Sequence, residues 1–401
     1  MGGGQNAHAA RETQAHFRAA RLLPDGCSAK WFPVTAPPAR PPVPGGARPR
    51  PFARRLLLAL LYSYVACLVL VCLLLRGIST YSWATVPALV DGTAYRPFVT
   101  RALLPAIVRG VVRATPALRT RVEARLASSL ASTRPGWHLD RALAVLGWTP
   151  ADAYVHMVAT GVMLACFLAL PWVLRRLLAV FYDLPPPVVD VAPVFGLLAL
   201  PLFFLPYARY LYDPGTLLLW AVGLLLVAER RHVTVWLLLP VLAYHKETAV
   251  LLPLLVALRE WELAPRGRVA LVAVAQLLVV ALVRLWLHAQ FAANPGGVVL
   301  LAGPGHLREL AMTAFRRPPY VPLVVAMLWA LVQSGWRESP RYLQNALPLV
   351  LLPLVLLALA FGYVDELRDY YEAWAIVFLI AVPAALTLLR ATPARIRAPF
   401  A

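Results

Sequence analysis

Three ionisable residues in succession interrupt an otherwise apolar segment of this sequence. His245, Lys246 and Glu247 lie in the middle of residues 233–258, with mostly apolar residues on either side. Ionisable side chains in such a segment are costly unless they are paired or line a wet cavity, so the triplet is a candidate site. We expect Lys246 to act as a point-charge ligand for phosphate, with His245 and Glu247 positioning it or an acceptor hydroxyl. The structural alternative is that Lys246 and Glu247 neutralise each other.

A second candidate stretch, residues 91–105, contains one carboxylate and two guanidinium groups, those of Asp91, Arg96 and Arg101. A carboxylate at a membrane boundary can act as a base, and flanking arginines can hold a phosphate through paired hydrogen bonds. This chemistry suits a base that faces a lipid-linked phosphate. The alternative is a structural loop in which Asp91 caps the following helix and the arginines contact lipid headgroups.

Arg209 introduces a third polar cluster, residues 209–215, ahead of another apolar run. Asp213 and Pro214 have the pattern of an N-cap followed by a proline in the first helical turn. A cap explains Asp213 without a function and leaves Arg209 available to a cleft.

Glu366 and Arg368 belong to a fourth cluster, residues 365–372, which packs five charges in front of the last apolar run. An exposed loop of this composition is usually only solvated, with a functional site as the alternative. Arg284 lies near the end of the apolar run 269–288. We interpret Arg284 as snorkelling outward, with the phosphate site as the alternative.

The sequence contains no familiar nucleotide-binding or metal-binding motif. A Walker loop, a GxGxxG fingerprint, HExxH and GxSxG are all missing, and the four cysteines have no metal-ligand spacing. Nucleotide hydrolysis and zinc chemistry are therefore poor candidates. We expect no cofactor, and nothing indicates a divalent cation.

Membrane helices must position these residues, because the composition excludes a soluble globule. Of 401 residues, 60% are apolar and only 14% are charged, and the mean hydropathy is +0.68. The apolar residues gather in runs of roughly 15 to 22, the length that crosses a bilayer core. The net charge of +19 then indicates cytoplasmic loop ends and anionic lipid rather than nucleic acid.

We therefore predict an all-α polytopic membrane protein with about eight full transmembrane helices plus a short re-entrant helical hairpin. The hairpin is expected at residues 233–258, because each half of that segment is too short to cross alone. One span with charges at mid-membrane is the alternative, but the hairpin places most short-loop arginines on one side, as the positive-inside rule favours. It also places every polar cluster on the outer side. The expected full spans are residues 56–75, 153–174, 188–206, 215–228, 269–288, 320–336, 346–361 and 374–389.

The remaining parts of the chain flank these spans. Residues 1–52 are expected to form a disordered cytoplasmic tail, because they hold few apolar clusters and end in a stretch rich in Pro, Ala and Arg. The transmembrane domain covers residues 53–390. Its long first outer loop, residues 76–152, includes an amphipathic helix at 116–133 that suits the headgroup plane, with packing over the bundle as the alternative. A basic tail, residues 391–401, follows, so both termini are expected in the cytoplasm.

Three short motifs in this chain resemble, in order and spacing, small bacterial integral membrane proteins of the GT-C glycosyltransferase type. They are Tyr95-Arg96-Pro97-Phe98 with Arg101 and Leu104-Pro105, then His245-Lys246-Glu247-Thr248, then Glu366-Leu367-Arg368. The His-Lys-Glu triplet is also similar to one carried by dolichyl-phosphate-mannose-dependent mannosyltransferases.

The resemblance implies an enzyme that moves a sugar from a polyprenyl-phosphate donor to a glycan or lipid acceptor, with inversion, on the periplasmic side of a bacterial inner membrane. It implies Asp91 as catalytic base, although the paired acidic motif of the family is reduced here to Asp91 followed by Gly92. The competing class is a non-catalytic transporter or flippase of lipid-linked sugars, or an assembly partner. The expected substrate-binding residues are Arg96, Arg101, Arg209, His245, Lys246, Glu247, Glu366 and Arg368.

Overall fold

The structure is a computed structural model, and it describes residues 51–75, 77–131, 143, 146–204, 209–297, 320–361, 366–389, 394–397 and 400. These residues form an all-α protein with a single two-residue strand pair. The fold class predicted from the apolar runs is therefore confirmed at the level of a helical membrane protein. Almost all of the expected N-terminal tail lies outside the described residues.

Each expected span coincides with a helix or with two consecutive helices. The elements before the polar break at residue 246 are α2 (Pro51–Leu74), α3 (Val86–Asp91), η1 (Phe98–Thr100), α4 (Leu103–Ala114), α5 (Pro116–Ala131), α7 (Ala153–Phe181), β1 (Tyr182–Asp183), α8 (Pro186–Leu198), α9 (Pro201–Phe204), α10 (Asp213–Ala228) and α11 (His232–His245). The elements after it are η2 (Glu247–Val250), α12 (Leu251–Glu260), α13 (Arg266–Gln290), α15 (Tyr320–Trp336), α16 (Arg341–Phe361), η3 (Leu367–Tyr370), α17 (Tyr371–Leu388) and β2 (Arg395–Ile396).

Six of these helical segments are long and apolar enough to cross a membrane: α2, α7, α8 with α9, α13, α16, and η3 with α17. The apolar helices α10, α11 and α15 are shorter. Several long helices expose leucines to the outside, as Leu271, Leu278 and Leu282 do along α13. Apolar surface of this extent suits contact with lipid. These helices indicate an integral membrane protein.

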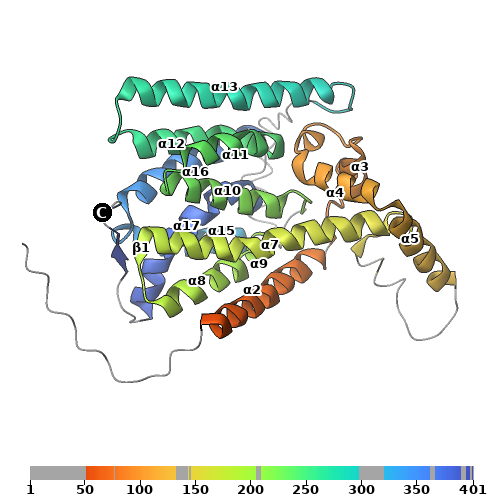
Figure 1. Ribbon diagram of the computed structural model, residues 1–401, viewed down its shortest axis with the longest axis horizontal. Coiled ribbons are helices and arrows are strands. Elements are labelled where there is room, and N and C mark those ends of the chain that lie inside the picture. The colour runs from red at the N-terminus through yellow and green to blue at the C-terminus, as the bar shows by residue number, and fades with distance from the viewer. Residues whose placement is uncertain are drawn as a thin grey trace, which may run out of the picture. The chain divides into compact units, whose positions relative to one another are not determined.

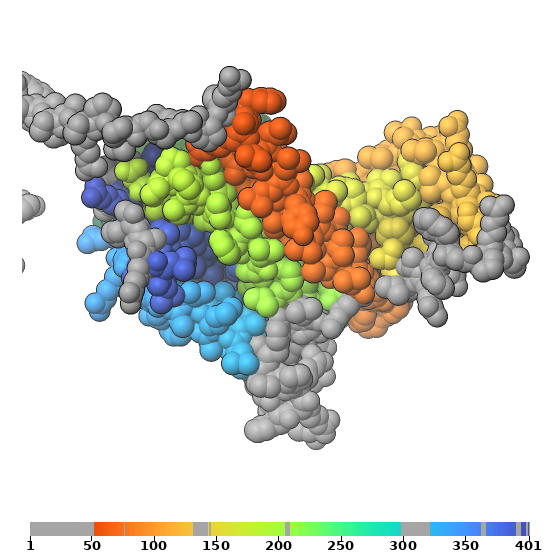
Figure 2. Space-filling model, turned by 90° about the horizontal axis from the view of Figure 1, so that it is seen from below, coloured from red at the N-terminus to blue at the C-terminus, as the bar shows by residue number. Residues whose placement is uncertain are grey.

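The helices of residues 51–401 pack in a sequence of neighbours that Figure 1 shows from one side to the other. Helix α13 lies along α11 and α12, which pack in turn on α10. On the far side of α10 lies α7, which carries α2 and α8. Figure 2 shows α2 running across the surface of the bundle, where Leu57 and Leu60 are exposed. A continuous cluster of buried apolar side chains lies between these layers, and polar side chains such as those of Asp190 and Gln276 are buried in the same bundle.

Helices α11 and α12 form the two arms of a hairpin. At its base, Arg230 donates to both carboxylate oxygens of Glu260 at 2.9 and 2.8 Å, and His232 lies 3.8 Å from the same carboxylate. The beginning of α11 and the end of α12 are therefore held together, and the chain reverses at its break near Lys246. The single continuous helix considered as the alternative does not form.

The base of the hairpin shares its end of the bundle with other ion pairs. Asp190 in α8 accepts hydrogen bonds from Arg54 of α2 at 2.7 Å and from Arg175 of α7 at 2.8 Å. The neighbouring Arg176 bonds to Glu229 at the end of α10 at 2.7 Å. Buried or half-buried carboxylates thus tie four helices together at this end.

The described part of the expected C-terminal tail packs on the body of the protein. Ile396 in β2 pairs with Tyr182 in β1. Phe400 is buried against the ring of Phe181, at 4.5 Å between centroids, and under the guanidinium of Arg259 at 4.3 Å.

Candidate functional site

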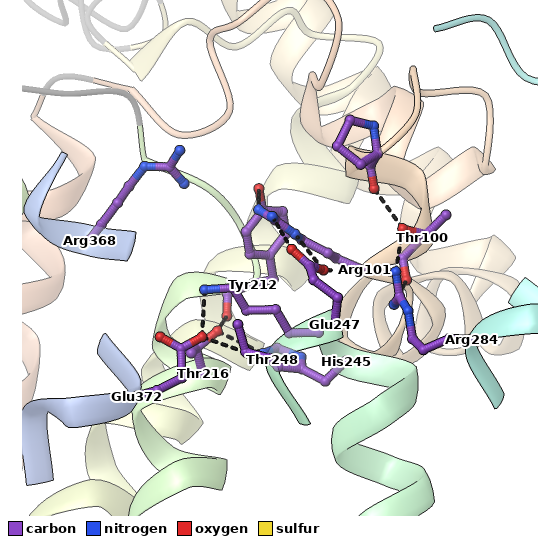
Figure 3. A network of polar contacts seen from close by, with 12 residues as sticks. Thr100, Arg101, Tyr212, Thr216, His245, Glu247, Thr248, Arg284, Arg368 and Glu372 are labelled. Carbon is purple, nitrogen blue, oxygen red and sulfur yellow. Dashed lines mark hydrogen bonds and ion pairs between the residues drawn. The ribbon is translucent and has the colours of Figure 1, made fainter. Parts of the chain in front are cut away.

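The polar clusters that the sequence places far apart meet at the tip of the hairpin. Figure 3 shows side chains of η1, α10, α11, η2 and α17 in one network, with Arg284 of α13 on one side and Glu372 of α17 on the other. We call this set the tip network: Thr100, Arg101, Tyr212, Asp213, Thr216, His245, Lys246, Glu247, Thr248, Arg284, Glu366, Arg368 and Glu372.

The break between α11 and η2 sends consecutive side chains to different partners. Helix α11 ends at His245, and Lys246 takes an extended backbone with φ −154° and ψ 148°. Helical residues that are adjacent in sequence already point about 100° apart, and the extended residue separates them further. Lys246 and Glu247 therefore do not neutralise each other, contrary to the structural alternative.

Lys246 pairs with Glu372 instead. Its Nζ lies 2.7 Å from Oε1 of Glu372, and Thr248 donates to the same oxygen at 2.6 Å. Both charged side chains are enclosed, because the side chain of Glu372 is fully inaccessible to solvent and that of Lys246 nearly so. Burial lowers the pKa of Lys246, but the negative charges of Glu372, Asp369 and Glu247 together outweigh burial and raise the pKa above its ordinary value.

Glu247 turns to the guanidinium groups. Arg101 donates from Nη2 to Oε1 at 2.5 Å and from Nε to Oε2 at 3.3 Å, while Nη2 of Arg284 lies 3.8 Å from Oε2. Arg101 also donates to the hydroxyl of Tyr212 at 2.7 Å. Burial raises the pKa of Glu247, but the charge and hydrogen bonds of Arg101 outweigh burial and hold the pKa below its ordinary range.

His245 is completely buried beside α10. Its Nε2 lies 3.0 Å from the hydroxyl of Thr216, and its Nδ1 has no hydrogen-bond partner among the described residues. Gly215 makes this approach possible, because a Cβ there would lie 2.8 Å from Cε1 of His245 and 2.7 Å from Cδ1 of Leu104. The ring is therefore packed tightly against α10 and Leu104, with no access to solvent.

Arg368 in η3 pairs with carboxylates beside the other members of the network, and Figure 3 shows no contact between it and the other residues drawn. Its Nε donates to Glu366 at 2.7 Å, its Nη1 lies 3.8 Å from Asp213, and its guanidinium lies 4.3 Å above the ring of Tyr210. Asp213 does not act as the expected N-cap. Helix α10 begins at Asp213 itself, and the carboxylate accepts the backbone N–H of Tyr210 at 2.9 Å, on the turn before the helix.

The hydrogen-bonded and ion-paired members of the tip network carry four positive and four negative charges, and Asp369 of η3 adds a further carboxylate near Lys246 and Arg368. The paired cations are Arg101, Lys246, Arg284 and Arg368, and the paired carboxylates are Asp213, Glu247, Glu366 and Glu372. Guanidinium and ammonium groups favour phosphate, whereas the threonine hydroxyls and the His245 ring of the network are buried. The arrangement can therefore bind an anionic group, provided that the group competes with the internal carboxylates.

Three of the expected site residues, Asp91, Arg96 and Arg209, are not among the side chains that make up the tip network. Asp91 is the exposed last residue of α3, and its carboxylate has no hydrogen bond or ion pair with any described residue. Arg96 donates to the carbonyl of Gly296 at 2.8 Å. Arg209 is buried and donates to the backbone carbonyls of Phe204 and Leu73. Their predicted roles stay predictions, and the contacts of Arg209 are those of a residue that holds the backbone.

The segment that contains Asp91 and Arg96 is nevertheless held against the loop that follows α13. Gly92, with φ +78°, ends α3, and Asn294 in the loop after α13 donates to the carbonyls of Gly92 and Ala94 at 2.8 and 2.9 Å. The segment is thus tied to the C-terminal end of the helix that carries Arg284.

Some members of the network were outside the expected set. Arg284 points inward rather than snorkelling, and donates to the backbone carbonyl and the hydroxyl of Thr100 at 3.0 and 2.9 Å. Tyr212 and Glu372 each lie within a polar cluster of the sequence, but nothing in the sequence distinguishes them from their neighbours. The only hint in the sequence was that Arg284 is a charged residue inside the apolar run 269–288, four residues after Val280.

Among the described residues, no group of three or more His, Cys, Asp or Glu side chains is arranged to hold a metal ion. Searches with protein-family models, among curated proteins and among solved structures find no match to this chain. A function must therefore be inferred from the residues of the tip network and their geometry.

Proposed function

We propose that this protein is a membrane glycosyltransferase of the GT-C type, which moves a sugar from a polyprenyl-phosphate donor to an extracytoplasmic acceptor. The observation that carries the proposal is the convergence of Arg101, Lys246 and Arg368 at one broken hairpin of a helical membrane protein. A lipid-linked phosphate needs cationic ligands at the membrane boundary, and a break between two helices can provide them there.

In the proposed reaction, Asp91 takes the proton from an acceptor hydroxyl, and the oxygen attacks the anomeric carbon of the sugar. The bond between that carbon and the phosphate oxygen breaks, and polyprenyl phosphate leaves with the electron pair. The cations of the tip network stabilise the negative charge that develops on the phosphate, which is the main catalytic contribution. An exposed carboxylate without internal partners, such as Asp91, is free to accept a proton from an outside hydroxyl.

Under this proposal the membrane is a bacterial inner membrane, the tip of the hairpin faces the periplasm, and both termini are cytoplasmic. The hairpin is re-entrant, and α10 and α15 complete about eight spans together with the six longer helical segments. The arginine-rich end that contains Arg54, Arg175 and Arg230 then faces the cytoplasm, as the positive-inside rule requires.

The test is transfer of a labelled sugar from polyprenyl phosphate by the protein reconstituted in liposomes. Asp91→Asn should abolish transfer without changing the thermal unfolding temperature, because the Asp91 carboxylate holds nothing in place. Asp183→Asn is the matched control, since Asp183 is an exposed aspartate on β1 that should leave transfer unchanged. Full transfer by Asp91→Asn would refute Asp91 as the base.

The second candidate is a transporter or flippase of lipid-linked sugars, and the pairing of the cations with internal carboxylates favours it. A half-exposed ion pair at a helix break, such as Glu247 with Arg101, can open and close around a substrate. The same liposomes separate the two functions. Sugar that reaches an acceptor supports the transferase, whereas intact labelled lipid that changes leaflet supports the transporter.

A further inference from the structure

Glu247 occupies a position in the tip network that suits an external anion. Its two carboxylate oxygens face Nη2 and Nε of Arg101 at 2.5 and 3.3 Å, with Arg284 3.8 Å away. Two parallel N–H groups of a guanidinium bind two oxygens of a carboxylate or of a phosphate in the same way. The position is therefore chemically equivalent to a phosphate site.

Glu247 also differs from the other carboxylates of the network in its access to solvent. Its side chain is 40% exposed, whereas those of Glu372, Asp213 and Glu366 are 0, 5 and 10% exposed. An enclosed carboxylate cannot leave its partner without remaining unpaired in the interior, which is costly. Glu247 can turn into solvent and be hydrated there, so it alone among these four can exchange with a ligand.

The two arginines do not depend on Glu247 for their placement. Arg101 is held by the hydroxyl of Tyr212 at 2.7 Å, and its guanidinium lies 4.9 Å from the centroid of that ring. Arg284 is held by the backbone carbonyl and hydroxyl of Thr100. Both side chains are only 12% exposed, so they would stay in position if Glu247 turned away.

We infer that Glu247 is a built-in substitute ligand, which fills the anion site on Arg101 and Arg284 in the resting protein and is displaced by a phosphate ester of the lipid substrate. This inference rests on the proposed function, and it specifies where the phosphate binds and what it must displace. The polyprenyl-phosphate sugar is a diester with one negative charge, and the polyprenyl phosphate that leaves after transfer is a monoester with up to two, so the leaving group competes with the carboxylate better than the donor does. In the resting protein, Glu247 also keeps the buried guanidinium groups of Arg101 and Arg284 paired when no substrate is bound.

The experiment measures binding of dodecyl phosphate to the detergent-purified full chain by calorimetry. Glu247→Gln keeps the size of the side chain but removes the competing charge, so dodecyl phosphate should bind about tenfold more tightly than to the wild type. Glu247→Asp, which retains the charge on a shorter side chain, should bind with intermediate affinity and serves if Glu247→Gln does not fold. Adding Arg101→Gln to Glu247→Gln should abolish the gain.

Glu366→Gln is the matched control, because it removes an equal charge from Arg368 at an enclosed position. An equal gain in Glu366→Gln would overturn the inference, since the effect would then be general electrostatics. The inference is also overturned if the wild type binds dodecyl phosphate as tightly as Glu247→Gln does. That result would leave the proposed phosphate site intact. No binding by either protein refutes the phosphate site and the inference together. Binding of inorganic phosphate is measured in parallel. Tighter binding of either probe by Glu247→Gln than by the wild type supports displacement. The probe that binds more tightly identifies the ligand as a lipid ester or as free phosphate.

Discussion

The ammonium group of Lys246 lies 2.7 Å from a carboxylate oxygen of Glu372, and the two residues join the break of the hairpin to the first turn of α17. The side chain of Lys246 is 8% exposed and that of Glu372 is 0% exposed, and Oε2 of Glu372 has no hydrogen-bond partner among the described residues. The hairpin and the last long helix are thus coupled through an enclosed ion pair, to which Thr248 adds a hydrogen bond.

Removing one partner of this pair should destabilise the protein strongly. Lys246→Met leaves Glu372 charged and unpaired in the interior, and we expect a loss of about 3–5 kcal/mol in the free energy of unfolding. The double variant Lys246→Met with Glu372→Gln should recover most of that loss, because no charge is left unpaired. Thermal and denaturant unfolding in detergent measure the stability of the single and the double variant. A double variant that loses as much stability as Lys246→Met, or more, would contradict the coupling. Arg119→Gln, which breaks the exposed pair with Glu123 on α5, should cost less than about 1 kcal/mol.

Gly215 should tolerate no side chain. A methyl group at Gly215 would meet His245 and Leu104 at 2.8 and 2.7 Å, so Gly215→Ala must displace the imidazole from Thr216. We expect a loss of about 1–3 kcal/mol in the free energy of unfolding, the usual cost of overpacking a core. Gly161→Ala in α7 is the control, because nothing lies within 4 Å of its added Cβ and alanine favours a helix. A Gly215→Ala variant as stable as Gly161→Ala would show that this contact is not tight.

Asp190 should stabilise the arginine-rich end of the bundle. Asp190→Asn removes the charge that Arg54 and Arg175 share, and we expect a loss of about 1–3 kcal/mol in the free energy of unfolding. Arg54→Gln should cost less, because Arg175 still pairs with the carboxylate and Arg54 is 40% exposed. Denaturant unfolding measures the loss in unfolding free energy for each variant. A larger loss for Arg54→Gln than for Asp190→Asn would show that Asp190 is not the shared partner of the two arginines.

The pairing of Glu247 with Arg101 predicts a defined pH dependence. The pKa of Glu247 is lower in the folded protein than its ordinary value of 4.5, so its stabilising contribution is fully present above that pH and is lost as the pH falls through the folded value. Because the side chain is 40% exposed, the contribution should be on the order of 1 kcal/mol. The difference in unfolding free energy between wild type and Glu247→Gln should be constant from neutral pH to about pH 5 and shrink only at more acidic pH. A difference that already shrinks between about pH 7 and pH 5 would indicate a raised pKa.

The sequence determined the helices of this protein and the break in its hairpin. Runs of apolar residues fix where a chain can form buried or lipid-facing helices, so the span expected at 153–174 became α7 and the segment at 233–258 became two short arms. His245, Lys246 and Glu247 could be identified as the break because charge inside an apolar segment is costly in any fold.

Only the tertiary structure decided which charges meet. Lys246 is adjacent to Glu247 in sequence but pairs with Glu372, and Glu247 pairs with Arg101, which is 146 residues away. Such partners depend on how α4, α10, α13 and α17 pack around the tip of the hairpin, and local patterns contain no information about that packing. For the same reason Arg284, Tyr212 and Glu372 entered the site only when the helices were assembled, while Asp91 lay outside the network.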